Sequence, residues 1–273
     1  MKITASDVNK LRQSTGAGMM DCKKALEESN GDFEKAVEIL RKKGQKVAAN
    51  RADRESSEGV VLAKVSDDNT YGIIISLNCE TDFVAKNEEY IQLAQSLASH
   101  ALNYSDKDSF LNSEFEGMKV SDKLLEQTGV IGEKIEIGSF EYLESEFVGS
   151  YIHAGSKIAS IVGLSEKFDN ADEVSKDISM QVAAMNPVAL DEKGVSQEIV
   201  EKEIEIAKDQ LRQEGKPEEM LDNIAKGKLK KFFKENTLVN QQFIKDNKQS
   251  ISDYLKSKSE NASVTGFARI GLV

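Results

Sequence analysis

The chain has 273 residues, of which 30% are charged and 39% are hydrophobic, and its formal net charge is −11 at pH 7. This length is sufficient for two domains, or for one domain with appendages, around a sizeable buried core. The acidic balance argues against a protein that wraps a nucleic-acid duplex, because phosphate binding needs a basic field. We therefore expect protein partners and no direct contact with nucleic acid.

The sequence also carries no pattern of a membrane or secreted protein. No apolar run approaches the roughly 18 residues that a membrane-spanning helix needs, and Met1-Lys2-Ile3 is followed directly by a predicted helix start. Cys22 and Cys79 lie in unrelated segments without paired spacing, which favours a reducing compartment over a disulfide framework. We expect a cytoplasmic protein that does not contact a membrane.

Residues 1–44 are predicted to form three short helices. Thr4 and Asp7 have the spacing of a capping box and start the first helix. Gly16-Ala17-Gly18 ends it, and the second helix runs from about Met19 to Glu28.

The third helix is predicted to begin after Asp32, a suitable N-cap, and to end before Gly44. A core of about forty residues is only marginally stable, so we interpret residues 1–44 as a domain that docks on another protein. Residues 45–58 are polar, lack apolar periodicity, and are predicted to be a linker.

Residues 59–143 are predicted to be the first half of the core. A hairpin of two strands starts it, followed by a junction loop, a long helix capped by Asn87, a short helix and a third strand. The predicted ranges are Gly59–Ser66, Tyr71–Cys79, Glu88–Leu102, Ser121–Gly129 and Ile135–Leu143. The segment 104–117 has no pattern that assigns it to a helix or strand.

The junction loop Thr81–Val84 lies between a predicted buried strand and a predicted helix, and such loops often carry function. Two interpretations are open. In the first, Phe83 folds back as a core or staple residue and Asp82 caps the helix. In the second, the charge and the ring are both exposed for a partner.

Residues 144–273 repeat the plan of the first half. A hairpin, Phe147–Ile152 and Lys157–Leu164, precedes a helix from Asp172 to Met185, and Val264–Ile270 is predicted to be a closing strand. The core is therefore predicted to be two related α+β halves, each with an antiparallel hairpin backed by a helix.

An arm at residues 196–234 is inserted in this second half. Ser196–Glu214 and Pro217–Lys234 are predicted to be two charged helices joined at Gly215-Lys216. They form either a helical hairpin packed on itself or a projecting coiled coil for self-association or partner contact.

Two stretches of sequence are more specific than these patterns. Leu11 to Leu26 reads LRQSTGAGMMDCKKAL, and Asn78 to Lys86 reads NCETDFVAK. With both stretches in this order, the chain resembles the translation elongation factor Ts family over essentially its whole length. Members of this family are guanine-nucleotide exchange factors for elongation factor Tu.

The resemblance implies an α+β fold in which a ubiquitin-associated-like three-helix domain precedes two α+β subdomains and a coiled-coil arm. It also implies a protein without covalent chemistry, cofactor or metal of its own, which releases GDP by disturbing the Mg²⁺ site of elongation factor Tu. A homodimer through the core or the arm is a further expectation.

The resemblance also implies which residues contact the partner. The four residues expected beside the partner's Mg²⁺ site are Thr81, Asp82, Phe83 and Val84. Further contacts to the GTPase domain are expected from Arg12, Gly16, Met19, Met20, Ile152 and His153. The chain departs from the family pattern at Gly138-Ser139, where arginines are frequent, and at Gln242, where proline is usual.

The sequence leaves two other classes of function open. An enzyme would use Cys79 as nucleophile, with Asp82 and His153 as orienting group and base, but no base lies near Cys79 in the sequence. An adaptor would use the first 44 residues to bind other proteins without accelerating nucleotide release.

Overall fold

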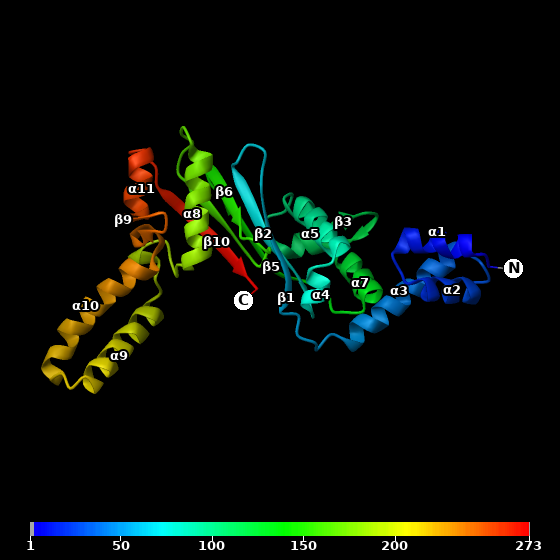
Figure 1. Cartoon of the computed structure of the whole chain (residues 1–273), viewed down its shortest axis with the longest axis horizontal. Helices are drawn as coiled ribbons and strands as arrows, with labels where there is room; N and C mark the ends of the chain where they lie inside the picture. The colour runs from blue at the N-terminus through cyan, green and yellow to red at the C-terminus, as the bar shows by residue number, and fades with distance from the viewer. Residues whose placement is uncertain (1–2, 273) are drawn as a thin grey trace. The chain divides into compact units, whose positions relative to one another are not determined.

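The computed structural model describes residues 3–272, which divide into two compact units (Figure 1). The first unit contains the chain up to Leu62 and Ile75–Phe140, and the second contains Ala63–Ile74 and Glu141–Gly271. Strands β1 (Glu58–Val65), β2 (Tyr71–Cys79) and β5 (Glu136–Glu144) form a sheet in the order β1-β2-β5, and each contributes residues to both units. The mixture of helices and small sheets confirms the predicted α+β class.

The first unit begins with α1 (Ala5–Thr15), α2 (Met19–Glu28) and α3 (Phe33–Asn50). The predicted capping box is present, because the Asp7 N–H donates to Thr4 Oγ1 and the Thr4 N–H donates to the Asp7 carboxylate. Asp32 caps α3 as predicted, its carboxylate accepting from the Lys35 N–H. The small core of the three helices consists of Val8, Leu11, Ala17, Cys22, Ala25, Leu26 and Ala36.

The prediction that the third helix ends before Gly44 is wrong. Helix α3 continues to Asn50, so the first six residues of the predicted linker 45–58 are helical. Gly44 is buried against Gly129 of α7 (Val120–Ile131), and a Cβ added at Gly129 would lie 2.4 Å from the Gly44 Cα. The two glycines therefore permit a close helix crossing, which a sequence pattern does not distinguish from a helix end.

The same crossing explains why the predicted C-terminal end of α7 was wrong. Gly129 lies inside the helix, and Gly132, with a φ of 82°, is the C-cap instead. At the other end the N-cap is Lys119 and not Ser121.

The rest of the first unit consists of α4 (Asp82–Ala85), α5 (Glu88–Ala101), α6 (Lys107–Asn112), β3 (Glu114–Phe115) and β4 (Met118–Lys119). Asn87 caps α5 as predicted, because its side-chain oxygen accepts from the Glu89 and Tyr90 N–H groups. Segment 104–117, which had no sequence pattern, is organised by the His100 ring at the end of α5. This ring lies 5.2–6.0 Å from the rings of Tyr104, Phe110 and Phe115.

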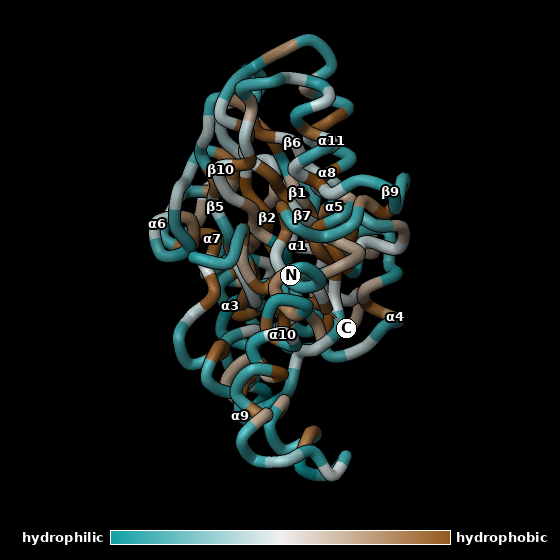
Figure 2. Tube along the Cα trace, turned by 90° about the vertical axis from the view of Figure 1, so that its left-hand side faces the viewer, coloured by the Kyte–Doolittle hydropathy of each residue, from teal (hydrophilic) through white to brown (hydrophobic). Residues whose placement is uncertain are grey.

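The second unit is built on an antiparallel sheet in the order β10-β7-β6, with β6 (Phe147–Ile152), β7 (Ile158–Leu164) and β10 (Val264–Gly271). Helix α8 (Ala171–Met185) packs on this sheet, and its apolar positions colour brown in the hydropathy view (Figure 2). Gly149 permits the close approach, because a Cβ there would lie 2.0 Å from Ser175 Oγ of the helix. The predicted hairpin, helix and closing strand are thereby confirmed.

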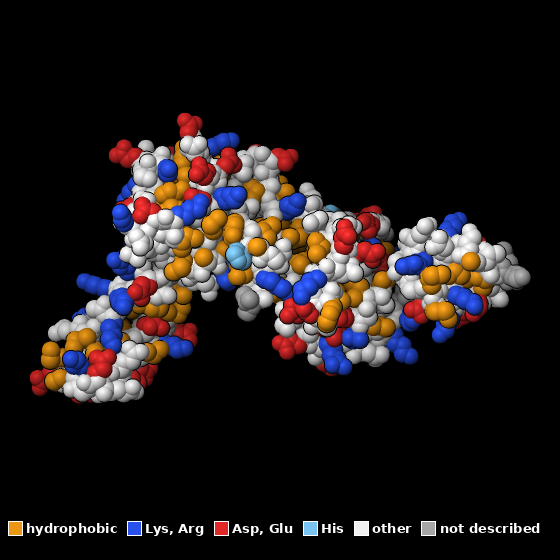
Figure 3. All heavy atoms as spheres, in the orientation of Figure 1, with side chains coloured by type: hydrophobic (Ala, Val, Ile, Leu, Met, Phe, Trp, Pro, Cys, Tyr) orange, Lys and Arg blue, Asp and Glu red, His pale blue; other side chains and the backbone are white. Residues whose placement is uncertain are grey.

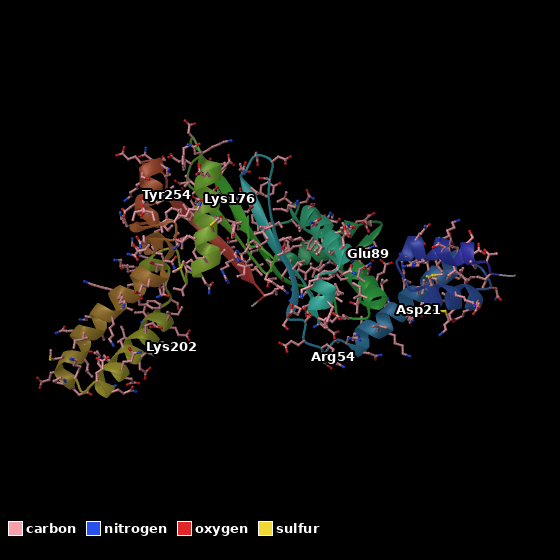
Figure 4. The ribbon with its side chains drawn as sticks, in the orientation of Figure 1. Asp21, Arg54, Glu89, Lys176, Lys202 and Tyr254 are labelled. Atoms are coloured by element: carbon pink, nitrogen blue, oxygen red, sulfur yellow. The ribbon has the colours of Figure 1, made fainter. Side chains whose placement is uncertain are left out.

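Helix α11 (Ile251–Lys258), together with β8 (Gln242–Phe243), β9 (Asp246–Ser250) and the short helix η2 (Leu238–Asn240), completes the second unit. Tyr254 of α11, labelled in Figure 4, stacks on Phe243 at 4.2 Å and donates to the buried Asp177 carboxylate at 3.0 Å. Lys245 Nζ lies 2.6 Å from the same carboxylate. Burial and the hydrogen bond to Asp177 raise the pKa of Tyr254, so it stays a neutral donor.

The arm contains α9 (Gln197–Gln213) and α10 (Glu218–Asn236), preceded by the short helix η1 (Glu192–Gly194). The two helices pack on each other as predicted, burying Ala207, Leu211, Leu221 and Ala225. Many charged side chains cover the rest of the arm (Figure 3), with ion pairs such as Lys208–Asp222 at 2.5 Å. Self-association through this arm remains a prediction.

Candidate partner-binding site

Phe83 is the most exposed large apolar side chain among the described residues, with 83% of its surface accessible. It lies in α4, a four-residue helix whose N-cap is Thr81, with the Val84 N–H 3.5 Å from Thr81 Oγ1. The interpretation in which Phe83 folds into the core and Asp82 caps the helix is therefore wrong. The ring is presented to solvent next to its acidic neighbour.

The Asp82 carboxylate forms an ion pair with Lys86 one turn later, at 2.6 Å. The hydrogen bond from Lys86 and its charge lower the pKa of Asp82, so the carboxylate is ionised at neutral pH. Both side chains are substantially exposed, and such surface pairs contribute little to stability. Asp82 can therefore exchange Lys86 for another cation at small cost.

The loop that carries Phe83 is attached to the rest of the unit by the Glu133 carboxylate. Glu133 Oε2 accepts from the Glu80 N–H at 3.1 Å and from the Thr81 N–H at 3.0 Å. Glu133 Oε1 accepts from the Thr81 hydroxyl at 2.7 Å. These bonds connect the residue after β2 and the cap of α4 to the segment that follows α7.

A second carboxylate makes the reciprocal connection. Glu80 Oε1 accepts from the Lys134 N–H at 2.7 Å, and Arg51 Nη1 lies 2.7 and 2.9 Å from the two Glu80 oxygens. Burial raises the pKa of Glu80, but the Lys134 N–H and the Arg51 guanidinium outweigh it, so the net effect lowers the pKa. Because Arg51 is the C-cap of α3, the loop is also joined to the end of the N-terminal helices.

An open groove of about 580 Å³ brings several of the predicted contact residues together. Its lining includes Arg12 and Gly16 from the N-terminal helices and Thr81, Phe83 and Val84 from the loop. A Cβ at Gly16, where φ is 68°, would lie 3.7 Å from Val130 of α7, so the turn runs close to that helix. Segments that are 65 residues apart in the sequence, from Gly16 to Thr81, thus share one surface of the first unit.

The other predicted contact residues lie outside this groove. Met19 and Met20 begin α2 and are 52% and 64% exposed, and apolar side chains are visible on the surface of the N-terminal helices (Figure 3). Ile152 and His153 lie at the end of β6 in the second unit, both exposed. Tyr151 Oη is 3.0 Å from His153 Nδ1.

Sequence reasoning did not predict Glu133 or Arg51 as parts of this site. The only local signal for Glu133 is its position between a glycine C-cap and a strand, which many surface carboxylates share. Arg51 falls in the segment predicted to be a flexible linker. Only long-range contacts reveal them. Arg51 pairs with Glu80, 29 residues away, and Glu133 accepts from Thr81, 52 residues away.

The residues named for the enzyme alternative lie in different environments. Cys79 is fully buried in β2, and its Sγ donates to the Thr81 carbonyl at 3.2 Å, while His153 belongs to the second unit. Within residues 3–272 there is no group of three or more His, Cys, Asp or Glu side chains that could hold a metal ion. Across the same residues, no helix combines the length and apolar character needed to cross a membrane.

Comparison with known proteins places the chain in a family. The family model described as "Elongation factor TS" matches residues 80–272, which begins just before the Phe83 loop. The chain belongs to the elongation factor Ts family. It is 65% identical over 271 residues to "Elongation factor Ts" of Christiangramia forsetii, covering 99% of each chain.

Two further members extend this similarity to lower sequence identity. The protein named "Elongation factor Ts" in Flavobacterium psychrophilum is 61% identical over 270 residues, covering 99% of this chain and 98% of that one. The one in Porphyromonas gingivalis is 46% identical over 275 residues, covering 100% and 99%. Elongation factor Ts relatives therefore include the N-terminal helices as well as the region that the family model matches.

Proposed function

We propose that the chain binds elongation factor Tu in its GDP form in the cytoplasm and accelerates GDP release, which allows GTP to bind. The observation that carries the proposal is the exposed Phe83 ring on a loop held by Glu133, in a member of the elongation factor Ts family.

The proposed mechanism requires no covalent step. A GTPase holds its nucleotide through backbone groups around the phosphates and through a Mg²⁺ ion that bridges phosphate oxygens to protein and water. A protein that weakens nucleotide binding by some factor is itself bound more weakly by the same factor when nucleotide is present. This reciprocity lets GTP displace the exchange factor and complete the cycle.

In this proposal Asp82 and Phe83 enter elongation factor Tu beside its Mg²⁺ site and displace the segments that orient the ion. Thr81 and Val84 maintain the shape of the loop, since Thr81 caps α4 and Val84 is partly buried. The small exposed helix α4 supports this role, because it can enter a partner without unfolding.

Phe83 alone supplies too little free energy for efficient exchange. Burial of one Phe side chain contributes roughly 1.5–3 kcal/mol, whereas a ten-thousandfold shift of an equilibrium requires about 5.5 kcal/mol. The remainder has to come from other contacts. We propose that Arg12, Gly16, Met19 and Met20 bind the GTPase domain, and that Ile152 and His153 contact a helix of that domain.

The proposal is tested with elongation factor Tu loaded with fluorescent GDP. The chain should accelerate loss of the fluorescent nucleotide when excess unlabelled GDP is present, and catalytic amounts should be sufficient. Binding without acceleration would contradict the exchange function and favour the adaptor alternative. A homodimer remains a separate prediction, which sedimentation of the purified chain tests.

Phe83→Ala is the decisive variant. It should reduce catalysed GDP release about tenfold or more, because one buried Phe corresponds to one or two decades, and it should affect binding to nucleotide-free partner less. Val188→Ala, which truncates another exposed apolar side chain, is the control and should leave the rate unchanged. An equal loss of exchange rate and of binding affinity in Phe83→Ala would mean that the ring contributes only to binding and does not promote GDP release.

A further inference from the structure

We propose that Glu133 is a positioning residue, whose carboxylate holds the Thr81–Val84 loop so that Phe83 remains directed outwards. This inference rests on the proposed function for its effect on exchange. Glu133 itself is a lining residue of the groove, and the partner need not contact it.

The first argument is the chemistry of the atoms that Glu133 contacts. All of them are donors, namely the Glu80 N–H, the Thr81 N–H and the Thr81 hydroxyl. An ionised carboxylate is the only side chain that accepts at both ends and offers no competing donor. Bonds of this charge-assisted kind are stronger than those between neutral groups.

The second argument is the direction in which the hydrogen bonds run. The Thr81 hydroxyl donates its proton to Glu133 Oε1, which leaves its lone pairs for the Val84 N–H at the start of α4. Glu133 therefore orients the cap, and the cap orients the first turn that carries Phe83. Without the carboxylate, the Thr81 hydroxyl can rotate, and the four-residue helix α4 loses its N-cap hydrogen bond.

The third argument is that α4 has few other attachments. Of its residues only Ala85 is buried, and the Asp82–Lys86 ion pair is internal to the helix and its next residue. Short helices are not stable by themselves. The bonds of Glu133 and Glu80, together with the weaker bond from Cys79 Sγ to the Thr81 carbonyl, therefore attach the Thr81–Val84 loop to the rest of the unit.

Positioning is measured first in the isolated protein. The chain contains no tryptophan, so Phe83→Trp introduces a single tryptophan in the loop, which is excited selectively at wavelengths where the six tyrosines do not absorb. Because the ring is already exposed, quenching is uninformative and the anisotropy of the probe is the suitable readout. Adding Glu133→Ala should lower the anisotropy by allowing faster local motion, and an unchanged anisotropy would overturn the proposal whether or not the chain is an exchange factor.

The control for this measurement is Glu116→Ala. Glu116 pairs with Lys123 at 3.0 Å in the same unit, so its truncation also removes a carboxylate and an ion pair. It should leave the anisotropy of Trp at position 83 unchanged. Equal falls in both variants would mean that the motion reports a general loss of rigidity.

The link to exchange is tested by a double-mutant cycle. Glu133→Ala should slow catalysed GDP release about tenfold in the otherwise unchanged chain, which corresponds to about 1.4 kcal/mol. In the Phe83→Ala background it should slow release by about twofold or less, because coupled residues are not additive. Full additivity would contradict a role that acts through Phe83.

Glu133→Gln provides a partial rescue. The amide oxygen can accept from the Glu80 and Thr81 N–H groups, but the amide nitrogen is a donor and cannot accept from the Thr81 hydroxyl. The variant should therefore recover part of the rate and of the anisotropy lost in Glu133→Ala. A Glu133→Gln chain as impaired as Glu133→Ala, yet equally stable, would contradict positioning by these hydrogen bonds.

Discussion

Phe83 differs from Phe110, another large aromatic residue of the first unit, in its exposure to solvent. Phe110 is fully buried at the His100 cluster, whereas Phe83 is 83% exposed on a four-residue helix. The position of this loop could be predicted from the sequence, since a strand pattern ends and a helix pattern begins there. The direction of the ring could not, because four residues are too few to define a periodic face.

His100 provides a prediction at the scale of a single residue. It lies among Tyr104, Phe110 and Phe115, its Nε2 is 2.8 Å from Ser113 Oγ, and burial lowers its pKa. In an NMR titration of the folded protein, the His100 imidazole should therefore titrate below the ordinary value of about 6.5. His153→Ala assigns the two histidine signals.

The sign of the accompanying stability change follows from which state binds the proton first. As the pH falls, the unfolded chain protonates His100 near pH 6.5, before the folded chain does. The stability that neutral His100 contributes is thus fully present above about pH 6.5 and declines as the pH falls towards the folded-state pKa. A midpoint at or above the ordinary value would refute both statements.

Elements with local signals were predicted well. The capped starts of α1, α3 and α5, the β6-β7 hairpin and α8 all depend on residues within one or two turns of one another. The ends of α3 and α7 depend instead on the crossing of Gly44 and Gly129. No local pattern distinguishes a glycine that ends a helix from one that admits a neighbouring helix.

This crossing gives a prediction at the scale of the element. Gly129→Ala should destabilise the chain by about 1–3 kcal/mol, because its Cβ would overlap the Gly44 backbone. Gly227→Ala, in the exposed middle of α10 with no atom within 4 Å of the new Cβ, should instead stabilise by roughly 0.5–1 kcal/mol. Urea unfolding of both variants measures the difference.

An outcome with the same sign for both substitutions would contradict the crossing, since the helix propensity of alanine acts equally in each. Limited proteolysis should also cleave Gly129→Ala in α3 after Gly44, where the unmodified chain is not cleaved. Such a cleavage would locate the disturbance in α3. Circular dichroism before unfolding serves to check that both variants retain their helices.

At the scale of the whole molecule, partner binding should be distributed over several surfaces. Replacing both Met19 and Met20 with Ala should weaken binding to elongation factor Tu about tenfold or more, because two exposed apolar side chains lose their burial at the interface. In contrast to Phe83→Ala, the loss should be similar for the GDP-bound and nucleotide-free forms of the partner. Calorimetry of each complex measures it.

Met185→Ala is the matched control, since it truncates a methionine of comparable exposure in the second unit. Its binding should equal that of the unmodified chain. If the double variant also bound normally, the N-terminal helices would have no share in recognition.

The candidate site illustrates the limit of prediction at this scale. The two sequence stretches that resemble the family contain Arg12, Gly16 and the Thr81–Val84 residues, so these could be predicted in advance. Their common groove could not, because it depends on the tertiary packing of α3 on α7. Glu133 and Arg51 were missed for the same reason.

Helix α3 has a further consequence, because it runs without a break from the N-terminal helices to Arg51, which is bonded to Glu80. Met19, Met20 and the Phe83 loop thereby belong to one compact unit and are connected through a continuous helix. When either has engaged, the other arrives already aligned, and its engagement loses little additional rotational or translational freedom. A flexible hinge at the same place would have required the partner to capture each surface separately.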